Sequence, residues 1–244
     1  MRSVIITGVS SGLGAALFDE FLASGDRLLA LGRRFTDAQH AAERAEPQRV
    51  RLRALDLAHP ATLPAAAEIA SFVHDAAEVV MVHNAGVIEP VGAIGALAAD
   101  EIERAVAVNL TAPLLLTNAV LGSGVLRAGD AAPPRTVTVL YVSSGAAHRQ
   151  IGGWSVYAAT KRAGEAFVEA LAAQHAGDSR VRAAVVQPGV VDTPMQERLR
   201  GYAAQDVYFP ERERFVALHR EGELVPPLDA ARRLIADYLG PVRS

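Results

Sequence analysis

The sequence predicts a single α/β domain, built as a doubly wound parallel sheet with helices on both faces. Two observations predict this fold class. Short runs of β-branched and aliphatic residues alternate along the chain with longer, helically periodic segments, and such alternation is typical of parallel sheets joined by helices. Half of the 244 residues are hydrophobic and only 5% are aromatic, so small aliphatic side chains must fill one large core.

Six strands and four helices follow from this pattern. Each strand is a short apolar run, and the predicted strands are 4–7, 27–31, 50–55, 78–82, 137–142 and 181–187. Helical periodicity predicts helices over 12–24, 100–120, 155–175 and 229–239. Residues 128–134 are expected to form a short loop, and 201–228 one long irregular region where a substrate lid can lie.

Composition and charge exclude several classes of function. The formal net charge is -3, so the chain has no basic field for nucleic acid or an anionic membrane. It contains no cysteine, which excludes thiolate chemistry and fits a cytoplasmic location, and its seven histidines lack metal-ligand spacing. We expect no metal site. The chain does not start like a signal peptide, and no apolar run approaches the roughly 20 residues of a membrane-spanning helix.

The first strand ends in a glycine-rich turn, Thr7-Gly8-Val9-Ser10-Ser11-Gly12-Leu13-Gly14. Glycines let the backbone approach a pyrophosphate, and the next helix points free N–H groups at that anion. The residues expected to bind a dinucleotide here are Gly8, Ser10, Ser11, Gly12 and Leu13. A rival interpretation is the nucleophile elbow of a serine hydrolase, Gly8-x-Ser10-x-Gly12, although that elbow normally follows several strands rather than the first.

Three further strand ends carry candidate cofactor residues. The second strand ends at Gly32 and is followed by Arg33 and Arg34, where an NAD-specific site would place a carboxylate. A guanidinium suits a 2′-phosphate, so Arg33 predicts NADP(H). The alternative is that one or both arginines are solvated residues at the entry to a helix. Asp56, which precedes Leu57, either accepts a hydrogen bond from an adenine amino group or is a capping or turn aspartate. The small residues after the fourth strand, which let the backbone lie against the cofactor, are Asn84, Ala85 and Gly86.

Tyr157 and Lys161 are spaced i, i+4 at the start of a predicted helix, thirteen residues or more after Ser144. Together with the TGxxxGxG turn, Asn84-Ala85-Gly86, Asn109 and Pro188-Gly189, they stand in an order that resembles the short-chain dehydrogenases/reductases. The resemblance covers residues 3 to about 195. It implies a Rossmann-like fold whose cofactor-binding part is about 1–150 and whose catalytic and lid part is about 151–244.

The resemblance also implies roles for these residues. Tyr157 would donate its proton to a carbonyl oxygen, and Lys161 would lower the phenol pKa from about 10 and hold the nicotinamide ribose. Ser144 would hold the carbonyl oxygen. Asn109 would hold a water that relays protons to Lys161; the alternative is a helix-kink or buried polar residue. Thr193 and the Val191 backbone would bind the nicotinamide amide.

A narrower resemblance points to the substrate. Gly153-Trp154-Ser155-Val156-Tyr157 and the segment from Pro188 to Gln196 are similar to sepiapterin reductase and the bacterial benzil reductases. This resemblance implies that the protein reduces a small ketone or 1,2-dicarbonyl with NADPH. Trp154 either lines the substrate pocket or packs as a loop aromatic. His148 either touches substrate or is a plain loop residue.

Two alternatives concern the whole protein. The chain can be a catalyst or a non-catalytic NAD(P)-sensing protein on the same fold, and the presence of both Tyr157 and Lys161 favours the catalyst. Family members usually finish with a seventh strand, whereas residues 240–244 do not have the pattern of one. We therefore expect a homodimer through the helices of Asn109 and Tyr157 rather than a tetramer.

Overall fold

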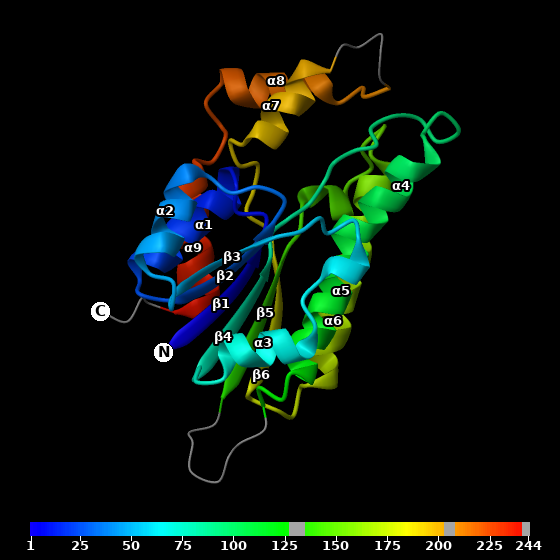
Figure 1. The fold of residues 1–244 in the computed structure, drawn as a ribbon. Helices are drawn as coiled ribbons and strands as arrows, with labels where there is room; N and C mark the ends of the chain where they lie inside the picture. Colours follow the sequence, from blue (N-terminus) through cyan, green and yellow to red (C-terminus); the bar gives the residue numbers. More distant parts are fainter. Residues whose placement is uncertain (127–134, 203–207, 241–244) are drawn as a thin grey trace.

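The computed structural model describes residues 1–126, 135–202 and 208–240. Six strands form one sheet in the order β3-β2-β1-β4-β5-β6, and every neighbouring pair is parallel (Figure 1). The strands are β1 (Arg2–Thr7), β2 (Arg27–Gly32), β3 (Val50–Ala54), β4 (Glu78–His83), β5 (Thr136–Val142) and β6 (Val181–Val186). The predicted doubly wound sheet is confirmed. The strand order reverses between β1 and β4, the point at which such sheets bind ligands.

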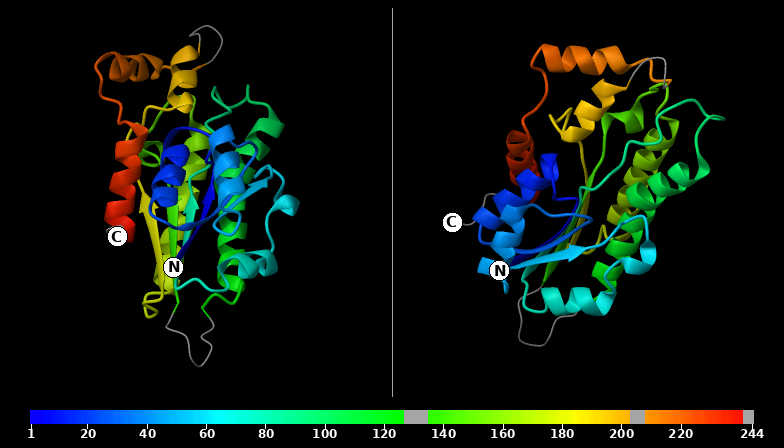
Figure 2. Two further views of the ribbon diagram at one scale, coloured as in Figure 1. Left: turned by 60° about the vertical axis from the view of Figure 1, so that its left-hand side comes forward. Right: turned by 45° about the horizontal axis from the view of Figure 1, so that its top comes forward.

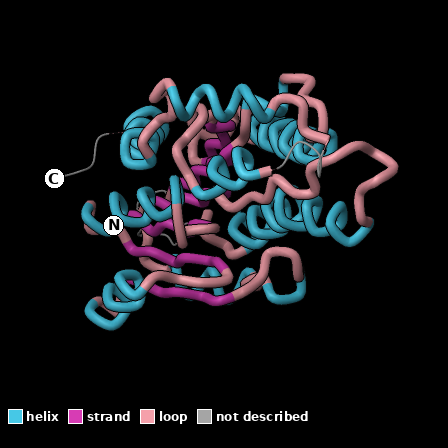
Figure 3. The backbone as a smooth tube through the Cα atoms, turned by 90° about the horizontal axis from the view of Figure 1, so that it is seen from above, coloured by secondary structure: helices cyan, strands magenta, loops and turns pink. Residues whose placement is uncertain are grey.

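Two helical layers enclose the sheet (Figures 1 and 3). One layer contains α1 (Gly12–Ala23), α2 (Asp37–Ala45) and α9 (Pro227–Leu239). The other contains α3 (Ala66–Val73), α4 (Ala99–Val106), α5 (Ala112–Gly122) and α6 (Ser155–Gln174). Two further helices, α7 (Pro194–Gly201) and α8 (Arg212–Arg220), lie above the end of the sheet where the strands finish (Figure 2).

Alternation along β1 divides the core into two halves. Val4 and Ile6 pack with the α1 and α9 side chains, whereas Ile5 faces the layer of α3 and α5. All three side chains are fully buried. Burial of each such side chain stabilises the fold by about 1.5–3 kcal/mol, so a one-residue slip of β1 would exchange its two faces at high cost.

The helix predicted over 100–120 is one continuous segment, Ala99–Gly122, but its middle is a π-helix, η2 (Ala107–Thr111). Such wide turns are frequent at functional sites. By length and composition the segment is apolar enough to cross a membrane, in contrast to the prediction that no run of the chain is. Its Ala112, Leu116 and Val120 side chains pack against the sheet instead, and core helices meet the same criterion.

Four helices were not predicted: α2, α3, α7 and α8. Helix α2 has few apolar residues and depends on a capping box, in which Thr36 and Gln39 bond each other's backbone N–H groups. Helix α8 lies in the region expected to be irregular. It buries only Phe215, and a helix with one buried side chain has no repeating apolar face that its sequence could show. The predicted loop 128–134 and most of the chain end lie outside the described residues.

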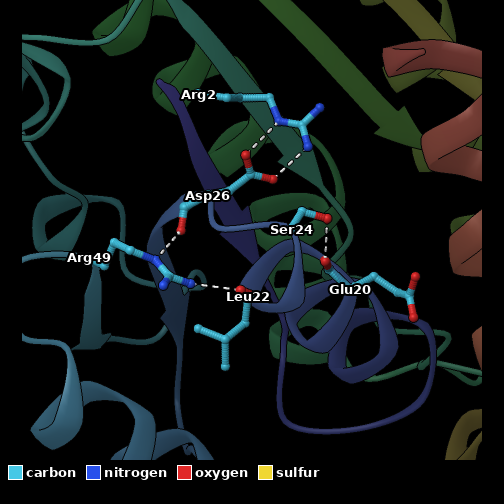
Figure 4. A network of polar contacts seen from close by, with 6 residues as sticks. All are labelled: Arg2, Glu20, Leu22, Ser24, Asp26 and Arg49. Atoms are coloured by element: carbon cyan, nitrogen blue, oxygen red, sulfur yellow. Dashed lines mark hydrogen bonds and ion pairs between the residues drawn. The ribbon is translucent and has the colours of Figure 1, made fainter. Parts of the chain in front are cut away.

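A polar network fixes the sheet at the opposite end from the ligand edge (Figure 4). Arg2 of β1 forms a two-pronged ion pair with Asp26 through Nε at 3.0 Å and one terminal nitrogen at 2.5 Å. Arg49, just before β3, donates to the Asp26 carbonyl at 3.1 Å and to the Leu22 carbonyl at 2.6 Å. Ser24 caps α1 by donating to the Glu20 carbonyl at 2.7 Å. The starts of β1, β2 and β3 are therefore held together.

Candidate active site

A cavity of about 360 Å³ opens at the carboxyl ends of the strands. It brings together residues from the first glycine turn, the ends of the strands, and the starts of α6 and α7. The predicted site residues that line it are Gly8, Ser10, Ser11, Gly12, Leu13, Arg33, Asp56, Leu57, Asn84, Ala85, Gly86, Ser144, Tyr157, Lys161, Val191 and Thr193. Asn109 is the one predicted site residue that does not line the cavity.

The glycine turn is shaped for close approach. A Cβ atom on Gly8, whose φ is +74°, would lie 2.8 Å from the Cα of Ala85, and one on Gly14 would lie 2.0 Å from the Gly8 carbonyl oxygen. Ser11 precedes α1 with no side-chain capping bond, so the first N–H groups of this helix stay open toward the cavity. These features fit the pyrophosphate of a dinucleotide.

Asn84 supports that turn from the neighbouring strand. Its amide nitrogen donates to the Thr7 carbonyl at 3.1 Å and to the Gly8 carbonyl at 2.8 Å. The Thr7 hydroxyl in turn accepts from the backbone N–H groups of Asn84 and Ala85. The end of β4 is thereby fixed against the end of β1, at the switch point of the sheet.

The far end of the cavity carries opposite charges. Arg33 and Arg34 are exposed there, and Asp56 forms an ion pair with Arg104 of α4 at 3.3 Å. Partial burial tends to raise the pKa of Asp56, but the hydrogen bond from the Ala58 backbone and the charge of Arg104 outweigh it and lower that pKa. Arg104 was not predicted, because its only sequence signal is one cation in a helix with several charges.

Ser144, Tyr157 and Lys161 meet at the inner wall of the cavity. Helix α6 places Tyr157 and Lys161 one turn apart, with 6% and 4% of their surfaces exposed. The Lys161 ammonium donates to the Val142 carbonyl at 2.8 Å, next to the strand end that carries Ser144. Ser144 opens the short helix η3 (Gly145–His148), and its hydroxyl accepts from the Ala146 N–H at 3.2 Å.

Burial controls the ionisation of this group. It raises the pKa of Tyr157 above its usual value, and the hydrogen bond with Ser144 acts in the opposite direction. Burial lowers the pKa of Lys161 to about 8, although the Glu165 charge tends to raise it. The phenol is therefore protonated near neutral pH, while the ammonium loses its proton only at mildly alkaline pH.

Asn109 lies in the π-helix behind the cavity. Its amide oxygen accepts from the Val87 N–H at 2.8 Å, and its amide nitrogen donates to the Val87 carbonyl at 2.8 Å and to the Thr160 hydroxyl at 3.0 Å. The Asn109 carbonyl accepts from the Tyr141 hydroxyl at 2.9 Å. The second lone pair of that carbonyl can accept a hydrogen bond from a water, so the predicted relay would start there.

Val191 and Thr193 close the cavity from the segment after β6. Val191 forms an isolated parallel bridge with Val225, which anchors the segment near α9. Thr193 caps α7 by accepting from the Gln196 N–H at 3.4 Å. Its methyl group lies so near the first turn that a Cβ on Gly12 would approach it to 2.7 Å.

Trp154 and His148 do not line the cavity. Trp154 is 4% exposed and packs in an aromatic cluster behind Tyr157, with ring centres 5.2 Å from Tyr157, 5.2 Å from Phe209 and 5.3 Å from Phe215. The His148 Nε2 lies 2.7 Å from a carboxylate oxygen of Glu165. For Trp154, the packing alternative describes this geometry, whereas the contact of His148 with Glu165 was not expected.

Several lining residues were not predicted from the sequence. Val87, Ile88 and Met195 add apolar wall, and Arg198 of α7 forms an ion pair with Glu89 at 2.6 Å. These positions follow the β4 and β6 motifs, which is the only signal that could have found them. Ser10 makes no hydrogen bond to a histidine in the described part of the chain, so the hydrolase interpretation lacks its base.

Comparisons with known proteins identify the family of this chain. The family model described as short chain dehydrogenase matches residues 2–203. The benzil reductase ((S)-benzoin forming) of Bacillus cereus is 30% identical over 239 residues, which cover 96% of this chain and 92% of that protein. The sepiapterin reductase of Bos taurus is 31% identical over 161 residues, covering 65% of this chain and 56% of the relative.

Solved structures show the same fold. The crystal structure of the KRED1-Pglu enzyme has a TM-score of 0.81 and 29% identity, covering all of this chain and 97% of the other. Neighbours of lower identity include a serine dehydrogenase with NADP+ (TM-score 0.70, 20% identity, covering 95% of this chain and 87% of that one). Another is a 3-ketoacyl-(acyl-carrier-protein) reductase from Brucella melitensis with NADH (TM-score 0.75, 21% identity, covering 96% of this chain and 89% of that one). The fold, the site and the family match together show that this chain belongs to the short-chain dehydrogenase family and is an oxidoreductase.

Proposed function

We propose that the protein is an NADPH-dependent carbonyl reductase that converts a small ketone or 1,2-dicarbonyl into an alcohol. The observation that carries this proposal is the meeting of Ser144, Tyr157 and Lys161 in the cavity that the glycine turn also lines. A buried phenol beside a buried ammonium is a poor arrangement for a passive binding site, since burying the charge is costly. It suits proton transfer to a reacting oxygen.

In the proposed reaction, Tyr157 gives its proton to the carbonyl oxygen and Ser144 holds that oxygen by a hydrogen bond. A nicotinamide cofactor, when bound, would supply the hydride. Lys161 stabilises the phenolate that remains, and returns a proton to it with the help of a water on the Asn109 carbonyl. The low exposure of Tyr157 and Lys161 supports these roles, because charge interactions are strong where water is excluded.

The cofactor would lie along the cavity. The turn from Gly8 to Leu13 would hold the pyrophosphate, Asp56 beside Leu57 the adenine, and Asn84 to Gly86 the middle of the molecule. Val191 and Thr193 would bind the nicotinamide amide. The preference for NADPH rests on Arg33, which is exposed just after β2. The strand ends at Gly32, which brings no side-chain carboxylate that would repel a 2′-phosphate.

The apolar wall of Val87, Ile88 and Met195 supports a flat, apolar substrate, as does the similarity to benzil reductases. The test is NADPH consumption, followed by absorbance, against a panel of benzil, other 1,2-diketones, aryl ketones, sugars and steroids. Fastest turnover of diketones or aryl ketones supports the proposal. Faster turnover of sugars or steroids would refute the substrate class, and binding without turnover would indicate the sensor.

A homodimer is the proposed assembly. Val106, Leu114 and Leu115 are apolar yet 36–42% exposed on the outer side of the helix that carries Asn109. Such a face gains stability when a second copy covers it. Light scattering at twice the chain mass supports the dimer, and four times the chain mass overturns it. A single domain over 1–244 and a cytoplasmic location stay predictions.

A further inference from the structure

Glu165 is a buried acid that the proposed mechanism does not use. It lies on α6 one turn beyond Lys161, and its side chain is 2% exposed. Four polar groups converge on its carboxylate. They are the hydroxyl of Ser143 at 2.6 Å, the Nε2 of His148 at 2.7 Å, a guanidinium nitrogen of Arg162 at 3.2 Å and the amide nitrogen of Gln187 at 3.5 Å.

Two of these contacts flank Ser144 along the chain. Ser143 is the residue before it, and His148 ends the short helix η3 that Ser144 opens. Ser143 bonds one carboxylate oxygen and His148 the other. The segment from 143 to 148 is therefore fixed to α6 at both ends, and α6 is the helix that also carries Tyr157 and Lys161.

This arrangement resists movement of Ser144. Hydrogen bonds to an ionised group are shorter and stronger than those between neutral groups. A buried carboxylate loses stabilisation when one of its partners leaves, so its contacts resist displacement of the groups that make them. Displacing η3 away from α6 would break the contact of His148, so the Ser144 hydroxyl keeps its place beside the Tyr157 phenol.

We propose that Glu165 is a positioning residue, which holds Ser144 in register with Tyr157 through Ser143 and His148. The inference rests on the proposed function, because it assigns Glu165 an effect on carbonyl reduction. It also makes a statement about the segment 144–148 that does not depend on activity. This positioning role differs from a general role in stability, because it depends only on those contacts of Glu165 that reach the Ser144 segment.

A matched pair of substitutions separates these roles. His148 and Arg162 both contact the same oxygen of Glu165, and their side chains are 48% and 54% exposed, so neither substitution removes a core side chain. Only His148 belongs to the Ser144 segment. Three variants are compared with wild type: His148→Ala, His148→Gln, which keeps an N–H donor, and Arg162→Ala. The readouts are kcat, KM, the Kd for NADPH, and backbone amide exchange over 144–148.

Displacements near 1 Å cost up to about a hundredfold in rate, so we expect kcat to fall about tenfold in His148→Ala. KM and the NADPH Kd stay within about twofold, because no binding contact is removed. Amide exchange over 144–148 becomes faster. His148→Gln restores kcat and the slower amide exchange, and Arg162→Ala changes neither of them.

Equal kcat values in His148→Ala and Arg162→Ala, or unchanged exchange over 144–148 in His148→Ala, overturn the inference. If wild type itself reduces no carbonyl, the proposed function fails, and the exchange comparison still decides whether Glu165 holds the segment.

Discussion

Lys161 and Tyr157 lie one turn apart on α6, with the ammonium nitrogen 5.9 Å from the centre of the phenol ring. Both are buried, and burial moves their pKa values in opposite directions: that of Tyr157 rises, and that of Lys161 falls to about 8. Charge on Lys161 is therefore the property of this pair that changes in the pH range where enzymes are assayed.

We expect kcat/KM for reduction to fall as pH rises through about 8, because Lys161 then loses the charge that stabilises the Tyr157 phenolate. The variant Lys161→Met should be slow, and its kcat/KM should not fall as pH rises through about 8. A wild-type rate that stays flat from pH 7 to pH 9.5, with Lys161→Met equally flat, would contradict the role of the ammonium.

Cofactor preference is the second prediction. Arg33→Ala should weaken NADPH binding about 10- to 100-fold, the effect of losing one charge-assisted hydrogen bond, and leave NADH binding nearly unchanged. Arg34→Ala is the matched control, since its side chain starts one residue further along and should contribute less. Fluorescence titration of both cofactors measures this. Equal weakening of NADH and NADPH in Arg33→Ala would show a structural role.

Acid stability depends on His83. Its ring is fully buried, one nitrogen lies 2.8 Å from the Thr117 hydroxyl, and burial lowers its pKa to about 3. The unfolded chain takes up a proton near pH 6.5 that the folded protein refuses, so the stability present above that pH is lost as pH falls toward 3. His83→Gln keeps a neutral hydrogen-bonding group and does not titrate.

Between pH 6 and pH 5, the free energy of unfolding should therefore fall more steeply in wild type than in His83→Gln, by up to about 1.4 kcal/mol per pH unit. Urea unfolding at several pH values measures both slopes. Identical slopes would mean that His83 is protonated in the folded protein.

The sheet and most of the cavity were predictable because they depend on local patterns. Each strand is a short apolar run, and the ends of parallel strands must meet at one edge, which brings Gly8, Asn84 and Ser144 together without further information. The spacing of Tyr157 and Lys161 likewise places both on one helix face.

Other features depend on contacts between distant segments. Asp56 and Arg104 are 48 residues apart and meet only because the fold brings α4 near the residues that follow β3. The π-helix around Asn109 is stabilised by Val87 and Thr160, which no periodicity reveals. Trp154 has the spacing of a pocket residue, yet Phe209 and Phe215 enclose it from a region that shows little pattern.

The variant Tyr157→Phe tests the central claim most directly, because it removes only the hydroxyl that would donate the proton. With NADPH and the best substrate of the carbonyl panel, kcat should fall by about 10²- to 10⁴-fold, the usual contribution of general acid catalysis. The Kd for NADPH should stay close to that of wild type. Turnover within about threefold of wild type would contradict Tyr157 as the proton donor, and with it the mechanism proposed for this site.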